Sequence, residues 1–155
     1  MHARTSEGDG MATVELRFSA QPEHVRTARL VAAAVARRAG VDEAVLDEVR
    51  LAVGEACSRA VGLHRGHGIT APVRVVLTDE DKTFSIEVGD EVPGPGADGR
   101  TASGPRDAAE EDADGEDDMG LAVISGLVDD LEVSSTDVGG VIRMSWPVTP
   151  VSVLP

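Results

Sequence analysis

Two pairs of neighbouring strand-like segments constrain the fold of this chain more than any other feature of its sequence. Residues 73–77 and 84–88 are rich in Val, Leu, Ile and Phe, and only a short polar turn separates them. Residues 131–134 and 141–146 repeat this arrangement around a turn at 137–140. Strands that follow each other without an intervening helix pair as antiparallel hairpins. We therefore expect a mixed, mostly antiparallel sheet.

Two amphipathic helices are predicted ahead of the first hairpin. After Pro22, apolar residues recur at steps of three and four as far as Ala39, and Gly40 ends this helix. Asp42 is expected to cap a second helix, which continues to about Leu63. Both helices therefore present one apolar face to a core.

One more strand and one more helix complete the predicted order. Alternating apolar residues at 14–18 predict a strand before the first helix, and residues 119–131 place apolar side chains on one helical face. The order is β-α-α-β-β-loop-α-β-β. It predicts an α+β fold, a two-layer sandwich with the helices on one face of the sheet.

The chain has 155 residues, which is the length of one domain. We expect this domain to span residues 12–147 and to be followed by a tail at 148–155. Residues 1–11 are polar and are expected to be a disordered leader, with Met1 or Met11 as the start.

Residues 91–118 differ sharply from the rest of the domain, because Pro, Gly, Asp and Glu dominate them. Such a segment cannot bury enough apolar surface to order itself. We expect a mobile, lid-like loop. Its second half carries eight carboxylates and no base: Asp107, Glu110, Glu111, Asp112, Asp114, Glu116, Asp117 and Asp118.

The charge balance excludes several partners. The chain has 14 basic and 28 acidic side chains, a net charge of −14. Carboxylates repel a phosphate backbone and an anionic bilayer, so we expect no binding to nucleic acid or to a membrane. Cys57 is the single cysteine, and no apolar run has the length of a signal peptide or a membrane span. A cytoplasmic protein is predicted.

The element order, with a long loop before the last helix, resembles the GHKL (Bergerat) ATPase domain of histidine kinases, gyrase and Hsp90. More narrowly, the chain resembles the bacterial RsbW/SpoIIAB-type anti-sigma factors over roughly residues 12–147. The resemblance is carried by residues 18–20, 28–29, 54–56, Asp90, 119–121, 129–130, Gly139 and 142–143.

This resemblance implies a regulator of transcription. Members of the family are serine kinases that hold a sigma factor and phosphorylate an anti-anti-sigma protein of the STAS type, and they are often homodimers. In the family an Ala-Arg pair on the first helix belongs to the surface that meets both partners. Ala28-Arg29 matches that pair, so the resemblance assigns Arg29 to partner binding.

The resemblance also implies a site for ATP with Mg²⁺. The family motif Glu-x-x-x-Asn supplies a general base and a magnesium ligand, which here correspond to Glu55 and Arg59. A guanidinium has no acceptor atom, so this chain has no metal ligand at that position. Two roles stay open for Arg59: an i,i+4 ion pair with Glu55, or direct contact with a phosphate in place of part of the metal's charge.

The strand-end motif Asp-x-Gly-x-Gly of the family places an Asp against the adenine amino group. Asp90 matches this residue and Gly94 matches the second glycine, whereas Val92 replaces the first. In the last strand, where the family often has Gly-Thr-Thr, this chain has Gly139 and Gly140 and no hydroxyl.

The family turn Gly-x-Gly-Leu opens the last helix and holds phosphates on its amides. Gly120 and Leu121 match it, and Asp118 replaces the first glycine. We expect Asp118 to cap the helix rather than leave its amides to a phosphate.

Two functions remain open at this stage. One is an anti-sigma factor that binds ATP and acts as a serine kinase on its antagonist, with Glu55 as general base. The other is a kinase-dead protein-binding module of the same fold that switches partners without nucleotide. The acidic loop suits either a shield against nucleotide or a docking surface for a basic helix of a sigma factor.

Overall fold

The computed structural model describes residues 2–8, 11–80, 82–94 and 120–148. Its strands are β1 (His2–Gly8), β2 (Met11–Phe18), β3 (Val73–Asp79), β4 (Thr83–Gly89), β5 (Asp130–Thr136) and β6 (Gly139–Pro147). Its helices are α1 (Pro22–Ala39), the short 3-10 helix η1 (Glu43–Val45) and α2 (Leu46–Gly66), and residues 120–127 are also helical.

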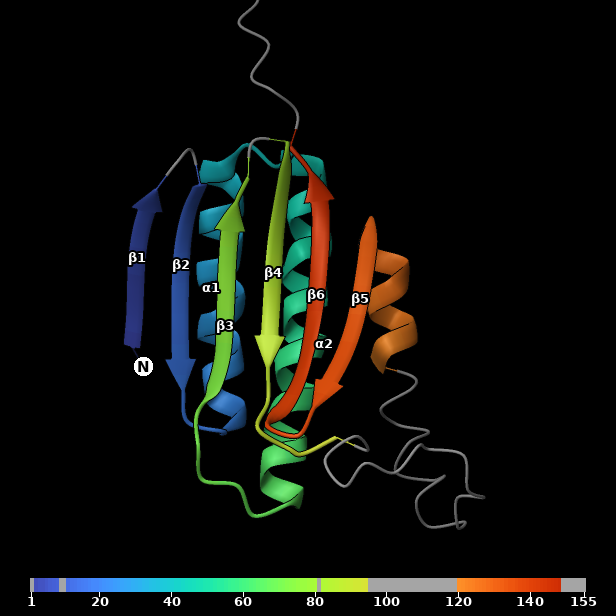
Figure 1. Cartoon of the computed structure of the whole chain (residues 1–155). Coiled ribbons are helices and arrows are strands. Elements are labelled where there is room, and N and C mark those ends of the chain that lie inside the picture. The colour runs from blue at the N-terminus through green and yellow to red at the C-terminus, as the bar shows by residue number, and fades with distance from the viewer. Residues whose placement is uncertain (1, 9–10, 81, 95–119, 149–155) are drawn as a thin grey trace, which may run out of the picture.

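The strands form one sheet with the order β1-β2-β3-β4-β6-β5. Figure 1 shows α1, α2 and the helix at 120–127 on one side of this sheet, which confirms the predicted α+β architecture. Every pair of neighbouring strands in the described residues is antiparallel, so the expected mixed sheet is corrected to an antiparallel one. The reason is that α1 and α2 run in opposite directions and return the chain to the end of the sheet where β2 stops.

The first residues of the chain also differ from the expectation. Residues 2–8 were predicted to lie in a disordered leader, but they form β1, which pairs with β2 from His2 opposite Arg17 to Gly8 opposite Met11. An edge strand is held by backbone hydrogen bonds, which any composition can supply. A polar sequence therefore carries little signal for such a strand.

Gly40 and Asp42 both mark helix ends as predicted, although Asp42 caps a different helix from the one expected. Gly40 ends α1 with a φ of 100°, a left-handed conformation that suits glycine. Asp42 accepts a 3.0 Å hydrogen bond from the backbone N–H of Ala44, so it caps η1 rather than α2. The second helix then continues to Gly66, beyond the expected end at Leu63.

The last helix is shorter than expected, because Leu131 lies in β5. Its end is tied to the sheet by Trp146 on β6, whose indole N–H donates a 3.1 Å hydrogen bond to the carbonyl of Leu127. Trp146 is buried and lies against Phe84 of β4, with 6.4 Å between the ring centroids. This contact positions the helix beside β5 and β6.

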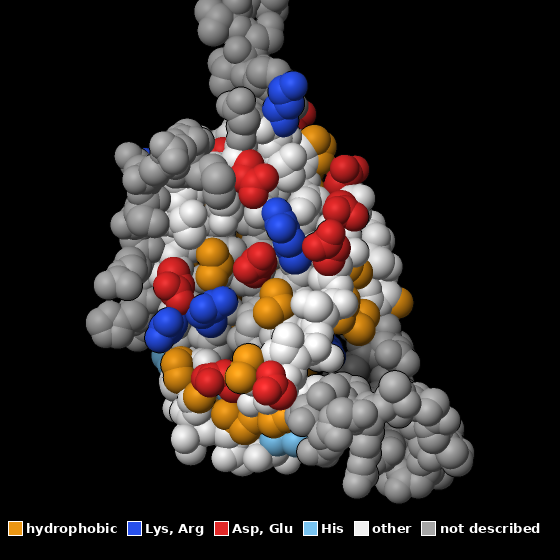
Figure 2. All heavy atoms as spheres, in the orientation of Figure 1, with side chains coloured by type: hydrophobic (Ala, Val, Ile, Leu, Met, Phe, Trp, Pro, Cys, Tyr) orange, Lys and Arg blue, Asp and Glu red, His pale blue; other side chains and the backbone are white. Residues whose placement is uncertain are grey.

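The core lies between the sheet and the helices, and it consists mainly of Val, Ala, Leu and Ile. Alternate residues of the strands point to the other face, which no helix covers in the described part of the chain. Figure 2 looks onto this open face, where Lys and Arg are interspersed with Asp and Glu. Among the described residues, no helix has the length and apolar character needed to cross a membrane.

Candidate functional site

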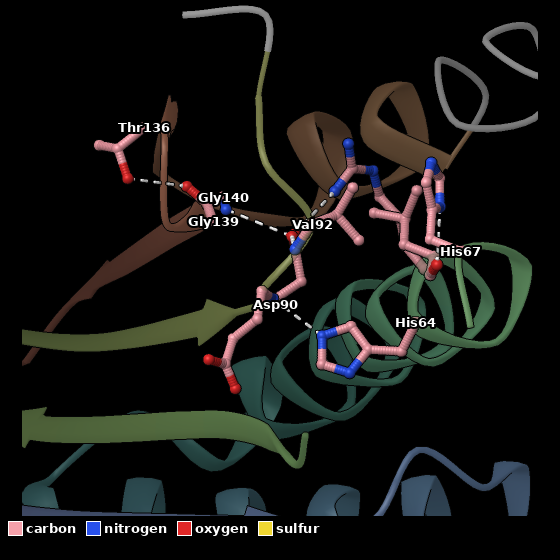
Figure 3. Close-up of polar contacts among 10 residues, drawn as sticks. His64, His67, Asp90, Val92, Thr136, Gly139 and Gly140 are labelled. Carbon is pink, nitrogen blue, oxygen red and sulfur yellow. Dashed lines mark hydrogen bonds and ion pairs between the residues drawn. The ribbon is translucent and has the colours of Figure 1, made fainter. Parts of the chain in front are cut away.

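Several predicted site residues meet where β4 ends. The chain leaves the sheet at Asp90, next to the turn between β5 and β6 and close to the C-terminal half of α2 (Figure 3). The expected loop at 91–118 and the expected cap Asp118 lie largely outside the described residues, which include only 91–94 of that segment.

Asp90 is held firmly at this junction. It is buried, and its Oδ1 accepts hydrogen bonds from the backbone N–H groups of Val92 at 2.9 Å and Gly140 at 3.2 Å. Its own backbone N–H donates to the carbonyl of Gly140 at 2.9 Å. These bonds fix the position of the carboxylate and use only one of its two oxygens.

Glycines at 139 and 140 make this arrangement sterically feasible. Gly139 has a φ of 153°, and a Cβ on it would overlap the backbone carbonyl of Asp90. A Cβ on Gly140 would lie 2.9 Å from Asp90 Oδ2. A threonine at position 140 would therefore displace the carboxylate. The sequence shows that the hydroxyl is missing but does not reveal this contact, because the two segments are far apart in the chain.

Gly94 is packed on the β5–β6 hairpin. Its N–H donates a 3.0 Å hydrogen bond to the carbonyl of Thr136, and a Cβ on it would lie 2.5 Å from Ser135 Oγ. The need for a glycine at this position therefore follows from contact with the hairpin.

Arg59 points toward Asp90. Its NH1 lies 4.0 Å from Asp90 Oδ2, and the two side chains are only 19% and 6% exposed. Of the two roles left open for Arg59, the ion pair with Glu55 is not the one the structure has, since Arg59 is paired with Asp90 instead. A buried carboxylate is a stronger partner than an exposed one because water screens the attraction less.

One atom of Arg59 has no partner of its own. The buried Nε is the single side-chain N or O atom in the described residues that is fully buried without a hydrogen bond. Such a donor is costly to leave unpaired. The site therefore contains an unsatisfied cationic donor beside a fixed carboxylate.

Glu55 is exposed and lies next to the last helix. A Cβ on Gly120 would be 3.8 Å from Glu55 Oε2, so the structure brings these two predicted residues together. Leu121 is half-buried against the core. Glu55, Arg59 and Asp90 thus follow each other from the start of this helix toward the end of β4.

His64 is a structural residue of the site. It is fully buried in α2, where its Nδ1 lies 2.9 Å from the carbonyl of Ala71 and the backbone N–H of Glu91 donates to its Nε2 at 2.8 Å. The neutral tautomer with the proton on Nδ1 satisfies both contacts. The sequence predicts a helix end at about Leu63, so it does not indicate that His64 lies on the helix.

Within the part of the chain that the structure describes, His67 and Cys57 have no hydrogen bond or ion pair with Asp90 or Arg59 that would place them in the site. His67 is exposed, and its Nδ1 lies 2.9 Å from the carbonyl of Leu63 in its own helix. Cys57 is buried, as expected for a small apolar residue. No group of three metal-ligating side chains is found among the described residues.

Arg29 lies on α1 and is exposed, but its stem crosses α2. A Cβ on Gly54 would be only 2.7 Å from Arg29 Cδ. The glycine before Glu55 therefore gives the side chain of Arg29 its path across the neighbouring helix.

The residues present fit an adenine contact but not a magnesium ion. Asp90 supplies a carboxylate at the end of β4, as the base requires. Magnesium requires oxygen ligands in octahedral geometry, whereas Arg59 presents only N–H donors and a positive charge at the position of the expected ligand. A metal at this point would meet electrostatic repulsion instead of coordination.

A cavity of about 300 Å³ adjoins this site, because Asp90, Gly139 and Gly140 line it together with Arg17 and Arg74. The two arginines share the carboxylate of Glu15, at 3.1 and 3.8 Å from their Nε atoms. Both cations are therefore partly neutralised.

Comparison with known proteins finds relatives over most of the chain. Residues 18–146 match the family described as histidine kinase-like ATPase domain. A serine-protein kinase RsbW from Oceanobacillus iheyensis is 27% identical over 143 residues, which cover 85% of this chain and 84% of the relative. A serine-protein kinase RsbW from Halalkalibacterium halodurans is 26% identical over 143 residues, 86% of this chain and 82% of the relative.

Proposed function

Because the chain belongs to the histidine kinase-like ATPase domain family, we propose that it is an anti-sigma factor of the RsbW type. It binds a sigma factor reversibly in the cytoplasm and releases it when an anti-anti-sigma protein of the STAS type competes, thereby regulating transcription. The observation that carries this proposal is the similarity to two serine-protein kinases RsbW over most of the chain.

The α1–α2 surface around Arg29 supports the proposal. The arginine is exposed, and its stem lies over Gly54 of α2, which places it where the two helices meet. Arginines are frequent anchors of protein interfaces. We place both partners on this surface.

The partner test uses the full chain as bait in the cells that encode it, followed by reconstitution with the purified proteins identified. We expect a sigma factor and an anti-anti-sigma protein that compete for the chain. Arg29→Ala should weaken both complexes about tenfold or more. Arg38→Ala is the matched control, because Arg38 is exposed on the same helix. Recovery of neither class of partner would refute the assignment.

Serine kinase activity is the second candidate function. It is favoured by the activity named for the relatives and by the exposed position of Glu55 beside Gly120. Arg59 favours the alternative in which partner competition acts without magnesium-dependent phosphoryl transfer. Incubation of the reconstituted antagonist with radiolabelled ATP and Mg²⁺ distinguishes the two. Transfer that Glu55→Gln abolishes would establish the kinase.

A further inference from the structure

We propose that Arg59 acts as a built-in cation in the nucleotide site, so that the site binds an adenine nucleotide in its metal-free form and Mg²⁺ opposes binding. The proposal concerns the ligand of this domain and does not depend on which protein partners the chain has. It inverts the metal dependence that an Asn at this position would support.

The charge of Arg59 distinguishes a metal ion from a phosphate. Arg59 is largely buried, and within the described part of the chain its ion-pair partner is Asp90. A divalent cation that approaches this guanidinium is repelled in a poorly screened environment, whereas a polyphosphate is attracted. Because metal-free ATP carries more negative charge than its magnesium complex, Arg59 selects the metal-free form.

The guanidinium of Arg59 has donors that Asp90 does not use. Its buried Nε has no acceptor, and the 4.0 Å separation of NH1 from Asp90 Oδ2 is too long for a hydrogen bond. Phosphate oxygens can satisfy these donors once the side chain turns from Asp90 toward the ligand. A guanidinium binds phosphate oxygens through charge-assisted hydrogen bonds, which are about twice as strong as neutral ones.

Asp90 offers one carboxylate oxygen to a base. Both backbone N–H groups that hold this carboxylate donate to Oδ1, so these bonds leave Oδ2 to accept from an adenine amino group. Oδ2 is also the atom that faces Arg59 at 4.0 Å. A bound base therefore replaces the Arg59–Asp90 ion pair, and the released guanidinium turns to the phosphates.

The experiment is a calorimetric titration of the full-length protein with ATP at constant ionic strength, once with EDTA and once with excess Mg²⁺. We expect saturable binding in EDTA, and an affinity about tenfold lower with Mg²⁺. Arg59→Asn should weaken binding in EDTA and reverse the effect of Mg²⁺. Arg59→Lys retains the positive charge and should retain the sign of the magnesium effect.

Arg65→Asn is the matched control, because Arg65 is exposed near the end of the same helix. It should behave like the wild type. Tighter binding of the wild type with Mg²⁺, or no binding in EDTA at millimolar ATP, would overturn the proposal. An Arg59→Asn variant with the magnesium response of the wild type would also overturn it. Circular dichroism verifies that each variant is folded, and none of these titrations contains a protein partner.

Discussion

At the residue scale, a histidine occupies the buried face of α2 at a position where an apolar side chain would continue the stripe of Cys57, Ala60 and Val61. His64 is fully buried, and its two ring nitrogens join the chain at Ala71 to the chain at Glu91. It therefore supports the backbone immediately after Asp90. Burial of this polar side chain is tolerated only because both ring nitrogens have hydrogen-bond partners.

We expect His64→Ala to lower the free energy of unfolding by about 2–4 kcal/mol, because it leaves a cavity and two unpaired backbone groups. His67→Ala is the control. Its ring contacts a carbonyl of the same helix and is exposed, so the change should be within about 0.5 kcal/mol. Urea denaturation measures both, and equal losses for the two variants would contradict this role of His64.

Cys57 gives a second prediction at this scale. Burial raises the pKa of its thiol from 9.0 to about 12. The folded state therefore keeps the proton while the unfolded state loses it, so stability falls as the pH rises from 9 toward 12.

Cys57→Ala should lack the contribution of the thiol to the pH dependence of stability. Its free energy of unfolding should therefore decline less steeply than that of the wild type above pH 9. In the native protein we also expect the thiol to react with Ellman's reagent only as fast as the chain opens. Identical pH dependence of the two proteins, together with rapid labelling of the native thiol, would show that the thiol is accessible.

At the scale of elements, small residues allow α1 and α2 to approach closely. Ala28, Ala32 and Ala36 are buried on α1, and Gly54 on α2 lies under the stem of Arg29. The helix–helix contact thereby determines the course of a side chain that we assign to partner binding. The sequence predicts each helix and a role for Arg29, but the spacing of residues within one helix does not reveal which residue of another helix it crosses.

Gly54→Ala tests whether the α1–α2 contact positions Arg29 for partner binding, because the new methyl group displaces the flexible stem of Arg29. We expect stability to change by less than about 1 kcal/mol, since alanine favours the helix by about the same amount as the displacement costs. Affinity for the sigma factor should fall several-fold in a binding titration. Gly62→Ala is the control, since a Cβ there meets nothing within 4 Å. Equal affinities for the two variants would exclude the coupling.

At the scale of the whole molecule, the net charge of −14 favours partners with basic surfaces. Eight of the carboxylates lie at 107–118 and carry no compensating base in that segment. We expect the affinity for the sigma factor to fall as salt is raised from about 50 mM to about 500 mM.

A variant in which those eight carboxylates become Asn or Gln keeps the chain length and should show a smaller salt slope. Titrations of both proteins at several salt concentrations measure the difference. Unchanged affinity and slope would reject docking of a partner on this segment and would favour the alternative that it shields the site from nucleotide.

The two hairpins, their antiparallel pairing, the helices and the family can all be predicted from the sequence alone. These properties depend on local periodicity and on short motifs, which neighbouring residues encode directly. Three other features follow from tertiary packing: β1 adds to the sheet, Arg59 is paired with Asp90 rather than Glu55, and Gly139 and Gly140 accommodate Asp90. Those outcomes depend on how α2 and the β5–β6 hairpin pack against the end of β4, and packing between distant segments leaves no periodic signal in a single sequence.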